Sequence, residues 1–495
     1  MRTVVVLAAG EGQRMKSALP KVLHPLLGRT LLGHVVAAGG PLAADRTLVV
    51  IGHGADEVRA HLAGIAPDAV PVLQEEQLGT GHAVRVALAG APLGTVTGTV
   101  VVLNGDVPLL RPETLRALVE AHEAAGAAAS VLTAEVTDPA GLGRIIRDRD
   151  GGIAAIVEER DASPDERAIR EINAGIYAFD AAALTDALGK LTNHNGQGEE
   201  YLTDVVELLV AAGHPVRAHA APDEVEAAGC NDRAQLASLR ALLRDRINHR
   251  WMVDGVSIID PATTWVDVTV TLGRDVTIEP NTHLRGTTSV ADGATIGPDS
   301  TLIDMTVGAG AVILRSHVVG ATVGAGGSVG PYAYLRPGTV LADRVKVGTF
   351  VEVKNSEVGT GTKIPHLSYV GDATIGEYTN IGAANVVVNY DGVTKHRTVI
   401  GSHVKTGSDT MLVAPVEVGD GAYTGAGTVV RRNVPPGALS VSGGPQRILD
   451  GWVESHRRGT PAAEAAARAR AAAADARSAD ARSADAAGDG ADPAE

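Results

Sequence analysis

Three observations predict an α/β domain, a linker helix and a parallel β-helix, followed by a disordered tail. Short β-rich runs alternate with amphipathic runs up to about residue 229. Aliphatic residues then recur every six residues from Val266 onward. The last 36 residues, from Thr460 to Glu495, contain no Leu, Ile, Val or aromatic residue. A chain of 495 residues has room for two or three domains at about 100–200 residues each.

Composition excludes several classes of function. The net charge of −15 argues against general nucleic-acid binding, which favours basic surfaces. The single cysteine, Cys230, rules out an intramolecular disulfide framework and a cysteine-rich zinc site. No apolar run approaches the roughly 20 residues that a membrane-spanning helix needs, and no targeting signal is visible. We therefore expect no membrane insertion and a cytoplasmic location.

Residues 1–229 are predicted to form the α/β domain. Thr3–Leu7, Leu48–Ile51 and Val100–Leu103 are short apolar runs typical of buried strands, and Pro112–Ala124 has a helical pattern. Alternation of strands and helices predicts a mostly parallel sheet.

Residues 230–251 are predicted to form the linker helix. Leucine and isoleucine recur at helical spacing at Leu236, Leu239, Leu243 and Ile247. A helix of this length extends about 30 Å, so it would connect two domains as a spacer.

Residues 252–459 are predicted to form the β-helix. Neither an α-helix nor a flat sheet has a six-residue period, whereas a hexapeptide coil turns one aliphatic side chain inward at each step. About ten coils are expected, and the register slips at Asn389–Arg397, where a loop would leave the coil. The spacing is unbroken in two series: Val266, Leu272, Ile278, Leu284, Val290, Ile296 and Leu302, and Val323, Val329, Leu335, Leu341, Val347 and Val353.

Residues 460–495 are predicted to be disordered, with a fraying helix as the one regular element they could form. Their Ala, Asp, Arg, Ser and Glu composition offers too little apolar surface to offset the conformational entropy of the chain.

A glycine-containing turn follows the first predicted strand. Gly10 and Gly12 let a ligand approach the main chain, whose N–H groups can hold phosphate, and Arg14 and Lys21 supply positive charge nearby. A glycine pair after a strand can also be a plain turn, but the two basic residues favour phosphate binding.

Asp106 lies just after the predicted strand Val100–Leu103. Open α/β sheets bind ligands at the carboxyl ends of their strands, and a single carboxylate can hold Mg²⁺ together with water and phosphate oxygens. The alternative is that Gly105-Asp106 only makes a turn. Cys230 is interpreted as a small buried residue and not as a nucleophile, because no histidine flanks it.

The motifs of the N-terminal half resemble those of sugar-nucleotide pyrophosphorylases. Leu7 to Met15 read Leu-Ala-Ala-Gly-x-Gly-x-Arg-Met and are followed by Pro20-Lys21, while Gln74 to Ala83 read Gln-Glu-Glu-Gln-Leu-Gly-Thr-Gly-His-Ala. Up to about Trp452, the chain is similar to the bifunctional bacterial family of N-acetylglucosamine-1-phosphate uridylyltransferases/glucosamine-1-phosphate acetyltransferases. The resemblance implies a Rossmann-like nucleotidyltransferase domain and a left-handed β-helix acetyltransferase domain.

The resemblance implies the residues of the uridylyltransferase site. Asp106 and Asn231 would hold Mg²⁺, and Lys21 would neutralise phosphate charge. Asn104 stands where the family has Tyr or Ser, which puts one neighbouring contact in doubt. The residues expected to bind UTP and UDP-N-acetylglucosamine are Leu7, Ala8, Ala9, Gly10, Arg14, Lys21, Gln74, Gly79, Thr80, Gly143, Glu158, Asn173 and Asn231, of which Gly143, Glu158 and Asn173 would bind the sugar.

The resemblance also implies the residues of the acetyltransferase site. His366 would be the general base, because an ammonium group is not nucleophilic until it loses a proton; alone, it would be interpreted as a surface histidine. Arg336, Lys354, Tyr369 and Asn380 would bind glucosamine-1-phosphate. Acetyl-CoA would lie against Ala383, Asn389, Tyr390, Ser408 and Ala426. Gly443 replaces a family arginine that contacts CoA, and Arg447 is the candidate substitute.

The predicted activity is acetylation of glucosamine-1-phosphate by acetyl-CoA, followed by Mg²⁺-dependent uridylyl transfer from UTP to N-acetylglucosamine-1-phosphate. A homotrimer is expected, both from the resemblance and because one flat wall of a β-helix cannot surround two substrates. Two alternatives remain: a one-reaction sugar nucleotidyltransferase with a regulatory β-helix, and a non-catalytic member of the same architecture. The resemblance also implies a role in supplying peptidoglycan synthesis.

Overall fold

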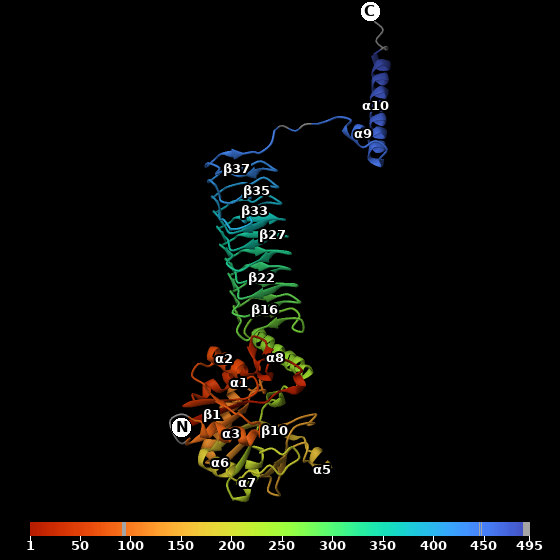
Figure 1. Cartoon of the computed structure of the whole chain (residues 1–495). Coiled ribbons are helices and arrows are strands. Elements are labelled where there is room, and N and C mark those ends of the chain that lie inside the picture. Colours follow the sequence, from red (N-terminus) through yellow and green to blue (C-terminus); the bar gives the residue numbers. More distant parts are fainter. Residues whose placement is uncertain (92–95, 445, 447, 489–495) are drawn as a thin grey trace, which may run out of the picture. The chain divides into compact units, whose positions relative to one another are not determined.

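The computed structural model describes residues 1–91, 96–444, 446 and 448–488 of the chain. Its residues fall into two units, Met1–Ser440 and Val441–Glu495, and the first unit holds the α/β part and the stacked coils (Figure 1).

The α/β part is built on one sheet with the strand order β11-β7-β10-β6-β1-β4-β5. β1 pairs in parallel with β4 and β6, and the predicted mostly parallel sheet is interrupted by β10, which pairs antiparallel with β6 and β7. β8 and β9 form a hairpin beside β10. The strands are β1 (Arg2–Ala8), β4 (Arg46–Ile51), β5 (Val70–Leu73), β6 (Thr99–Asn104), β7 (Ala129–Glu135), β8 (Arg144–Arg147), β9 (Ile153–Val157), β10 (Glu171–Asp180) and β11 (Val216–Ala220).

Helices cover both faces of this sheet. Along β1 and β6, alternate residues enter different hydrophobic clusters: Val4 and Val101 pack with α1, α2 and α4, whereas Val5 and Val100 pack with α3, α6 and α7. Burial on both faces explains why these strands are almost uninterrupted apolar runs. The helices are α1 (Leu31–Gly39), α2 (Ala55–Ile65), α3 (Thr80–Ala89), α4 (Pro112–Ala125), α5 (Pro164–Arg167), α6 (Ala181–Leu188) and α7 (Asp204–Ala211), and a short hairpin, β2 (Pro25–Leu26) and β3 (Arg29–Thr30), precedes α1.

The predicted linker is helix α8 (Arg233–Val253), and it packs against both the α/β part and the first coil. Its buried leucines belong to one cluster with Met15 and Leu109 of the α/β part and with Val266 of the first coil. The Asn248 amide also donates to the carbonyl oxygens of Pro261 and Thr264, both at 2.9 Å. One cluster therefore joins the edge of the α/β part to the coils, while the two clusters on the faces of the sheet are separate from it.

Three parallel sheets form the walls of the β-helix, which we call walls I, II and III. Wall I contains β12 (Ser257–Ile258), β15 (Thr277–Ile278), β18 (Thr295–Ile296), β21 (Val312–Ile313), β24 (Ser328–Val329), β27 (Lys346–Thr349) and β30 (Lys363–His366). Wall II contains β13 (Trp265–Val266), β16 (His283–Arg285), β19 (Thr301–Ile303), β22 (His317–Val319), β25 (Tyr334–Leu335), β28 (Glu352–Lys354), β31 (Tyr369–Gly371), β33 (Val386–Val388), β35 (Met411–Val413) and β38 (Val429–Val430). Wall III contains β14 (Thr271–Leu272), β17 (Ser289–Val290), β20 (Thr306–Val307), β23 (Thr322–Val323), β26 (Val340–Leu341), β29 (Glu357–Val358), β32 (Ala373–Ile375), β34 (Thr398–Ile400) and β36 (Val416–Val418), and β37 (Tyr423–Thr424) pairs with β39 (Leu439–Ser440) after them.

The six-residue periodicity correctly identified the interior of the coils. The residues of both predicted series are buried, except Leu272, which is partly buried at the first coil. Stacked partners such as Val353 and Val370 are 17 residues apart, whereas Val387 and Leu412 are 25 apart. The longer coil contains the predicted loop at residues 389–397.

The second unit carries helices α9 (Trp452–His456) and α10 (Pro461–Gly488). Residues that we predicted to be disordered therefore form a helix that ends at Gly488. A helix was the one regular element that we expected their composition to permit. Alanine has the highest helix propensity, which favours α10, and the helix also contacts α9 through the ion pair of Arg470 with Glu454. Among its described side chains, Ala463 is the buried one.

Candidate functional sites

The turn after β1 brings the predicted phosphate-binding residues to the carboxyl edge of the sheet. Ala8 and Ala9 are buried, while Gly10 and Arg14 are exposed. Gly12 has φ 67°, and a Cβ there would lie 2.6 Å from the Lys21 Cβ, so this position has to be glycine for Lys21 to pack against the turn. Arg14 makes no ion pair among the described residues, which leaves its guanidinium available to a ligand.

Lys21 and Asp106 form an ion pair at this edge. The Lys21 ammonium donates to Asp106 Oδ2, and the two side chains are 15% and 21% exposed. The turn that carries Asp106 is held against β1 by the Gly105 N–H, which donates to the Leu7 carbonyl oxygen at 2.9 Å. The predicted phosphate ligand and the predicted metal ligand are therefore neighbours, and each neutralises the other.

Asn231, the second predicted metal ligand, reaches the same place through Cys230. The Cys230 N–H donates to the Asp106 carbonyl oxygen at 2.9 Å. Burial, together with the Asp106 carboxylate, raises the pKa of the Cys230 thiol to about 11. A fully buried neutral thiol fits our interpretation of Cys230 as a small core residue.

Gln74, Gly79 and Thr80 lie together where β5 leads into α3. The buried Gln74 amide donates to the Gly79 carbonyl oxygen at 3.2 Å and lies 2.9 Å from His82 Nδ1. Gly79 has φ 114°, and a Cβ there would collide with the Glu200 carbonyl oxygen. The Thr80 hydroxyl accepts from the Leu202 N–H at 3.0 Å, so it also holds the segment before α7.

The three residues predicted to bind the sugar lie on β10 and the β8–β9 hairpin. The Asn173 N–H donates to the Gly143 carbonyl oxygen at 2.9 Å, and a Cβ built on Gly143 would lie 3.5 Å from Glu158 Oε2. Burial raises the pKa of Glu158, opposed by the hydrogen bond from the Thr203 hydroxyl at 3.3 Å. The structure thus brings these three residues together.

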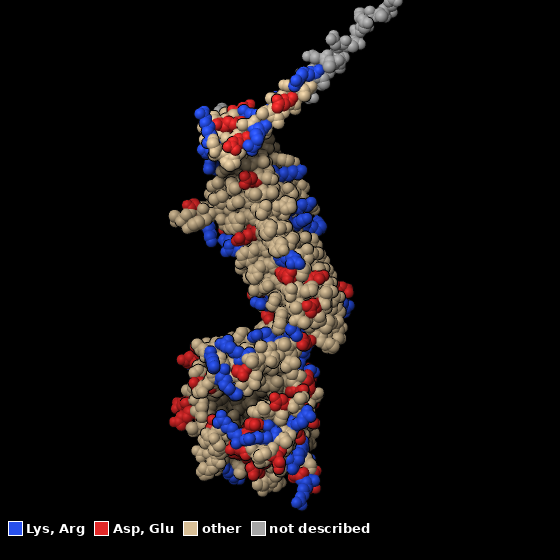
Figure 2. All heavy atoms as spheres, turned by 90° about the vertical axis from the view of Figure 1, so that its right-hand side faces the viewer, with Lys and Arg blue, Asp and Glu red and all other residues tan. Residues whose placement is uncertain are grey.

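Two residues of this group were not predicted from the sequence. Tyr177 accepts from the Asn173 amide at 2.6 Å, next to the β-bulge between these two residues, and Thr203 donates to Glu158. The four-residue spacing of Asn173 and Tyr177 on a strand gave no signal, because only the bulge places them side by side. One face of the α/β part is hollowed, and lysine and arginine side chains border the hollow (Figure 2).

In the β-helix, wall II carries a row of polar side chains. Tyr334, Glu352 and Tyr369 are stacked in register, and Arg336 Nη1 donates to Glu352 Oε1 at 2.9 Å. The predicted Arg336 and Tyr369 are therefore both next to Glu352, which was not predicted.

A second cluster on wall II surrounds Asp372. Lys354 Nζ lies 3.0 Å from each Asp372 oxygen, and Asn389 Nδ2 donates to Asp372 Oδ2 at 2.6 Å. The Asn389 amide also lies 3.3 Å from the Tyr369 hydroxyl. Asp372 thus brings Lys354 and Asn389 together, and Tyr369 joins them through Asn389. Asp372 was not predicted, although its position one coil beyond Lys354 could have revealed it.

His366 ends β30 on wall I, on the other side of a corner from Tyr369. Its side chain is exposed and has no hydrogen bond among the described residues. The Ala384 N–H donates to the His366 carbonyl oxygen, the Asp409 N–H to that of Ala383, and the Gly427 N–H to that of Ser408. The predicted Ala383, Ser408 and Ala426 therefore continue away from His366 along one edge, coil by coil.

The remaining predicted residues lie at the margins of these clusters. Asn380 stacks between Lys363 and Lys405 on the side of wall I. Tyr390 is exposed in the extra loop, where its hydroxyl donates to the Gly392 carbonyl oxygen at 2.7 Å. Gly443, where the family arginine is missing, is exposed, and Arg447, the candidate substitute, lies outside the described residues.

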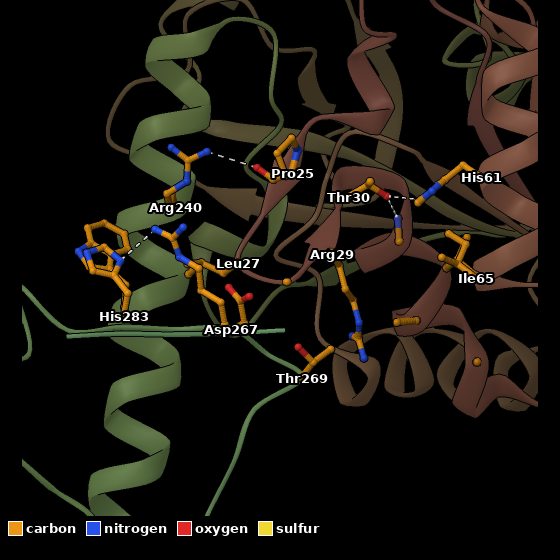
Figure 3. A pocket seen from close by; sticks show the side chains of 17 residues that line it. Pro25, Leu27, Arg29, Thr30, His61, Ile65, Arg240, Asp267, Thr269 and His283 are labelled. Atoms are coloured by element: carbon orange, nitrogen blue, oxygen red, sulfur yellow. Dashed lines mark hydrogen bonds between the residues drawn. The ribbon is translucent and has the colours of Figure 1, made fainter. Parts of the chain in front are cut away.

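A cavity of about 1250 Å³ lies elsewhere, between the β2–β3 hairpin and the first coils (Figure 3). Arg240 donates to the Pro25 carbonyl oxygen and His61 bonds the Thr30 hydroxyl on its walls. Its described lining contains none of the predicted site residues. Volume alone therefore does not identify the site here.

The described residues contain no group of three or more His, Cys, Asp or Glu side chains able to hold a metal ion. Asp106 and Asn231 nevertheless fit Mg²⁺, which takes one or two protein oxygens and completes its shell with water and substrate phosphates. Among the described residues no side-chain hydrogen bond uses Asp106 Oδ1 or the Asn231 amide, so both oxygens are available. No helix in the described part of the chain is long and apolar enough to cross a membrane.

Comparison with known proteins gives matches over both halves of the chain. The MobA-like NTP transferase domain matches residues 4–252, and the bacterial transferase hexapeptide repeat matches residues 397–432. A protein of Streptomyces avermitilis called "Bifunctional protein GlmU" is 58% identical over 94% of this chain and 96% of its own length. Proteins of the same name from Thermobifida fusca and Corynebacterium diphtheriae are 58% and 53% identical, each over 94% of this chain and 97% of its own length.

Proposed function

Because the chain belongs to the bifunctional GlmU family, we propose that it makes UDP-N-acetylglucosamine in two reactions at two separate sites. The β-helix transfers the acetyl group of acetyl-CoA to the amine of glucosamine-1-phosphate. The α/β part then transfers UMP from UTP to the N-acetylglucosamine-1-phosphate formed and releases pyrophosphate. The observation that carries this proposal is the pair of distinct polar clusters, one around Lys21 and Asp106 and one around Asp372.

For uridylyl transfer, a phosphate oxygen of N-acetylglucosamine-1-phosphate attacks the α-phosphorus of UTP, and the bond to pyrophosphate breaks. Lys21 and the main-chain N–H groups of the turn after β1 bind the phosphates, with Arg14 beside them. Gln74, Gly79 and Thr80 bind the uridine part. Gly143, Glu158 and Asn173 orient the sugar so that its phosphate points at the turn.

Mg²⁺ would be held by Asp106 and Asn231. When bound, it would neutralise charge on the phosphates. The Lys21–Asp106 ion pair supports this assignment, because it keeps both charged side chains at the turn before substrate arrives. Incoming phosphate and cation can then each take one member of the pair.

For acetyl transfer, the amine of glucosamine-1-phosphate attacks the thioester carbonyl carbon, and the carbon–sulfur bond of acetyl-CoA breaks. His366 takes the proton that the amine must lose, while the CoA thiolate leaves. Arg336 and Lys354 bind the sugar phosphate, and Tyr369 and Asn380 bind the sugar. Acetyl-CoA lies along Ala383, Ser408 and Ala426, beside Asn389 and Tyr390. No covalent enzyme intermediate is required.

We further propose that the protein is a homotrimer in which a second copy completes each acetyltransferase site. His366 and Tyr369 lie on different walls. In a single chain the substrates would therefore lie against two open surfaces and would not be enclosed. Between the walls, Tyr332, Phe350 and Leu367 stack along one corner with 55%, 59% and 60% of their surfaces exposed. A row of exposed apolar side chains beside His366 fits contact with another copy. Since UTP and acetyl-CoA are both cytoplasmic compounds, we place the enzyme in the cytoplasm.

The test is incubation of the full chain with glucosamine-1-phosphate, acetyl-CoA, UTP and Mg²⁺, with all products measured by mass spectrometry. We expect CoA, pyrophosphate and UDP-N-acetylglucosamine in equal amounts. The His366→Ala variant should lose CoA release by about 10²–10⁴-fold and still convert added N-acetylglucosamine-1-phosphate. Pyrophosphate without CoA release would favour a one-reaction nucleotidyltransferase with a regulatory β-helix. Absence of both products would favour a non-catalytic protein.

A further inference from the structure

Asp372 accepts more side-chain hydrogen bonds than any other carboxylate of the coils. Its two oxygens accept from Lys354 Nζ at 3.0 Å each, from Asn355 Nδ2 at 2.7 Å and from Asn389 Nδ2 at 2.6 Å. The residue is only 8% exposed. A buried carboxylate needs such partners, because desolvation of an unpaired charge is costly.

These contacts join three successive coils. Lys354 ends β28, Asp372 lies one coil further at the corner before β32, and Asn389 follows β33 in the coil after that. The Asp372 N–H also donates to the Lys354 carbonyl oxygen at 3.0 Å. Asp372 thus holds two side chains on the preceding coil, Lys354 and Asn355, and one on the following coil, Asn389.

Lys354, Asn355 and Asn389 all donate to Asp372 in the structure, and the Lys354 ammonium has no acceptor atom to offer in return. Burial alone would raise the pKa of Asp372, but hydrogen bonds from Asn355, Lys354 and Asn389 hold that pKa below its usual range. An amide in its place would remove the negative charge that pairs with Lys354, and its NH₂ group would need the Asn355 or Asn389 amide to turn its oxygen towards it.

We propose that Asp372 is a positioning residue of the acetyltransferase, which holds Lys354 for the sugar phosphate and Asn389 for acetyl-CoA. This inference rests on the function proposed above for those two residues. Asp372 itself touches neither substrate in this arrangement. It acts by removing the freedom of two side chains that do.

Asp304 provides a matched control from the same corner of the β-helix. Both aspartates have left-handed backbone conformations, with φ 51° at Asp372 and 52° at Asp304. The Asp304 carboxylate accepts from the N–H and hydroxyl of Thr287 at 2.9 and 3.1 Å, and it contacts none of the predicted substrate residues. Asparagine tolerates this backbone conformation, so Asp→Asn changes the charge at both sites with little strain.

The experiment measures acetylation kinetics of full-length Asp372→Asn and Asp304→Asn proteins, with melting temperature and uridylyl transfer as controls for folding. For Asp372→Asn, we expect the KM values for both glucosamine-1-phosphate and acetyl-CoA to rise about tenfold. For Asp304→Asn, we expect both to stay within about twofold of the parent values. Uridylyl transfer should be unchanged in both.

Double mutants separate positioning from general loosening of the coil. In a Lys354→Ala background, Asp372→Asn should no longer raise the KM for glucosamine-1-phosphate but should still raise that for acetyl-CoA. In an Asn389→Ala background, Asp372→Asn should no longer raise the KM for acetyl-CoA but should still raise that for glucosamine-1-phosphate. Asp372→Glu keeps the charge and should recover part of the activity.

Several outcomes would overturn the proposal: equal effects of Asp372→Asn and Asp304→Asn, additive effects in both double mutants, or equal losses in Asp372→Asn and Asp372→Glu. Failure of the underlying function is distinguishable, because the parent protein would then release no CoA, or His366→Ala would release it as fast as the parent. If the parent is active, His366→Ala is inactive and Asp372→Asn is normal, only the role of Asp372 is wrong.

Discussion

The two catalytic regions bring distant residues together by different means. In the α/β part, the turn after β1, Gln74 after β5 and Asp106 after β6 meet because parallel strands end at the same edge of the sheet. In the β-helix, Lys354, Asp372 and Asn389 meet because each lies one coil beyond the last. The first arrangement depends on the tertiary fold, and the second on a repeat length.

The two regions also differ in how far one chain completes them. Gln74 is buried, and the Lys21–Asp106 pair is mostly covered, so the α/β site is a recess within a single chain. His366 and the Asp372 cluster instead lie on outer walls that meet at an exposed apolar corner. We infer that the uridylyltransferase works chain by chain, whereas the acetyltransferase needs neighbouring copies.

Asp106→Ala should have the largest effect and should separate the two regions. Loss of the carboxylate would remove the proposed metal ligand and leave Lys21 unpaired, so uridylyl transfer should fall by on the order of a thousandfold. Acetylation should stay within about twofold of the parent rate, because the sites share no residue. Both rates are measured on the same preparation.

Asp186→Ala, which breaks an exposed ion pair with Lys190 in the same part, is the control and should change neither rate. Equal loss of both activities in a folded Asp106→Ala protein would contradict two independent sites.

Removal of Mg²⁺ should make the same distinction without mutation. With EDTA present, uridylyl transfer should stop, because charge on the phosphates is no longer neutralised, whereas thioester aminolysis mainly needs a base. Each rate is followed separately, by pyrophosphate and by CoA release, and Mg²⁺ is added back as the control. Persistent uridylyl transfer in EDTA would overturn the assignment of Asp106 and Asn231 to a metal.

The sequence predicted the β-helix more completely than the α/β part, for a physical reason. A six-residue period indicates directly which side chains point inward, and Val347 and Val353 are buried as expected. The same period, extended to whole coils, would have placed Asp372 beside Lys354. The coil of 25 residues between Val387 and Leu412 shows as a break in the pattern, and the loop lies there.

The α/β site was predicted mainly from motifs, and what the motifs leave out could not be found. Tyr177 meets Asn173 only because β10 contains a bulge, and Thr203 meets Glu158 only through the packing of two distant segments. The ion pair between Lys21 and Asp106 was not predicted either, since Lys21 was assigned to phosphate and Asp106 to Mg²⁺. The linker helix was predicted as a spacer that connects two domains, and its apolar spacing does not show which residues of the two domains pack on it.

Mixing two inactive acetyltransferase variants tests the shared site on the outer walls. If each site combines His366 of one copy with Asn389 of the next, randomly mixed His366→Ala and Asn389→Ala subunits should restore about a quarter of the sites. Recovery of CoA release after the two proteins are dissociated and reassembled together is the measurement, with each variant treated alone as the control. A monomer that acetylates at the assay concentration, shown by light scattering, would falsify the shared site.

The smallest effect is expected at Cys230, which joins Asn231 to Asp106 through the main chain. Its native pKa of about 11 exceeds the ordinary thiol value of 9.0, because burial disfavours the thiolate. The native state thus holds this proton more tightly than the unfolded state does, so the associated stability is complete below pH 9 and is lost as pH rises towards 11. Relative to Cys230→Ala, the parent protein should lose about 1–2 kcal/mol of unfolding free energy over that range. Uridylyl transfer by Cys230→Ala should stay within about twofold of the parent rate, since alanine keeps the main-chain N–H that donates to the Asp106 carbonyl oxygen. Alkylation by iodoacetamide at pH 8 provides a second measurement: the native thiol should react at least about a hundredfold more slowly than the thiol in urea. Equal alkylation rates in both conditions, or loss of uridylyl transfer on substitution, would show that Cys230 is a reactive part of the site and not a residue of the core beneath it.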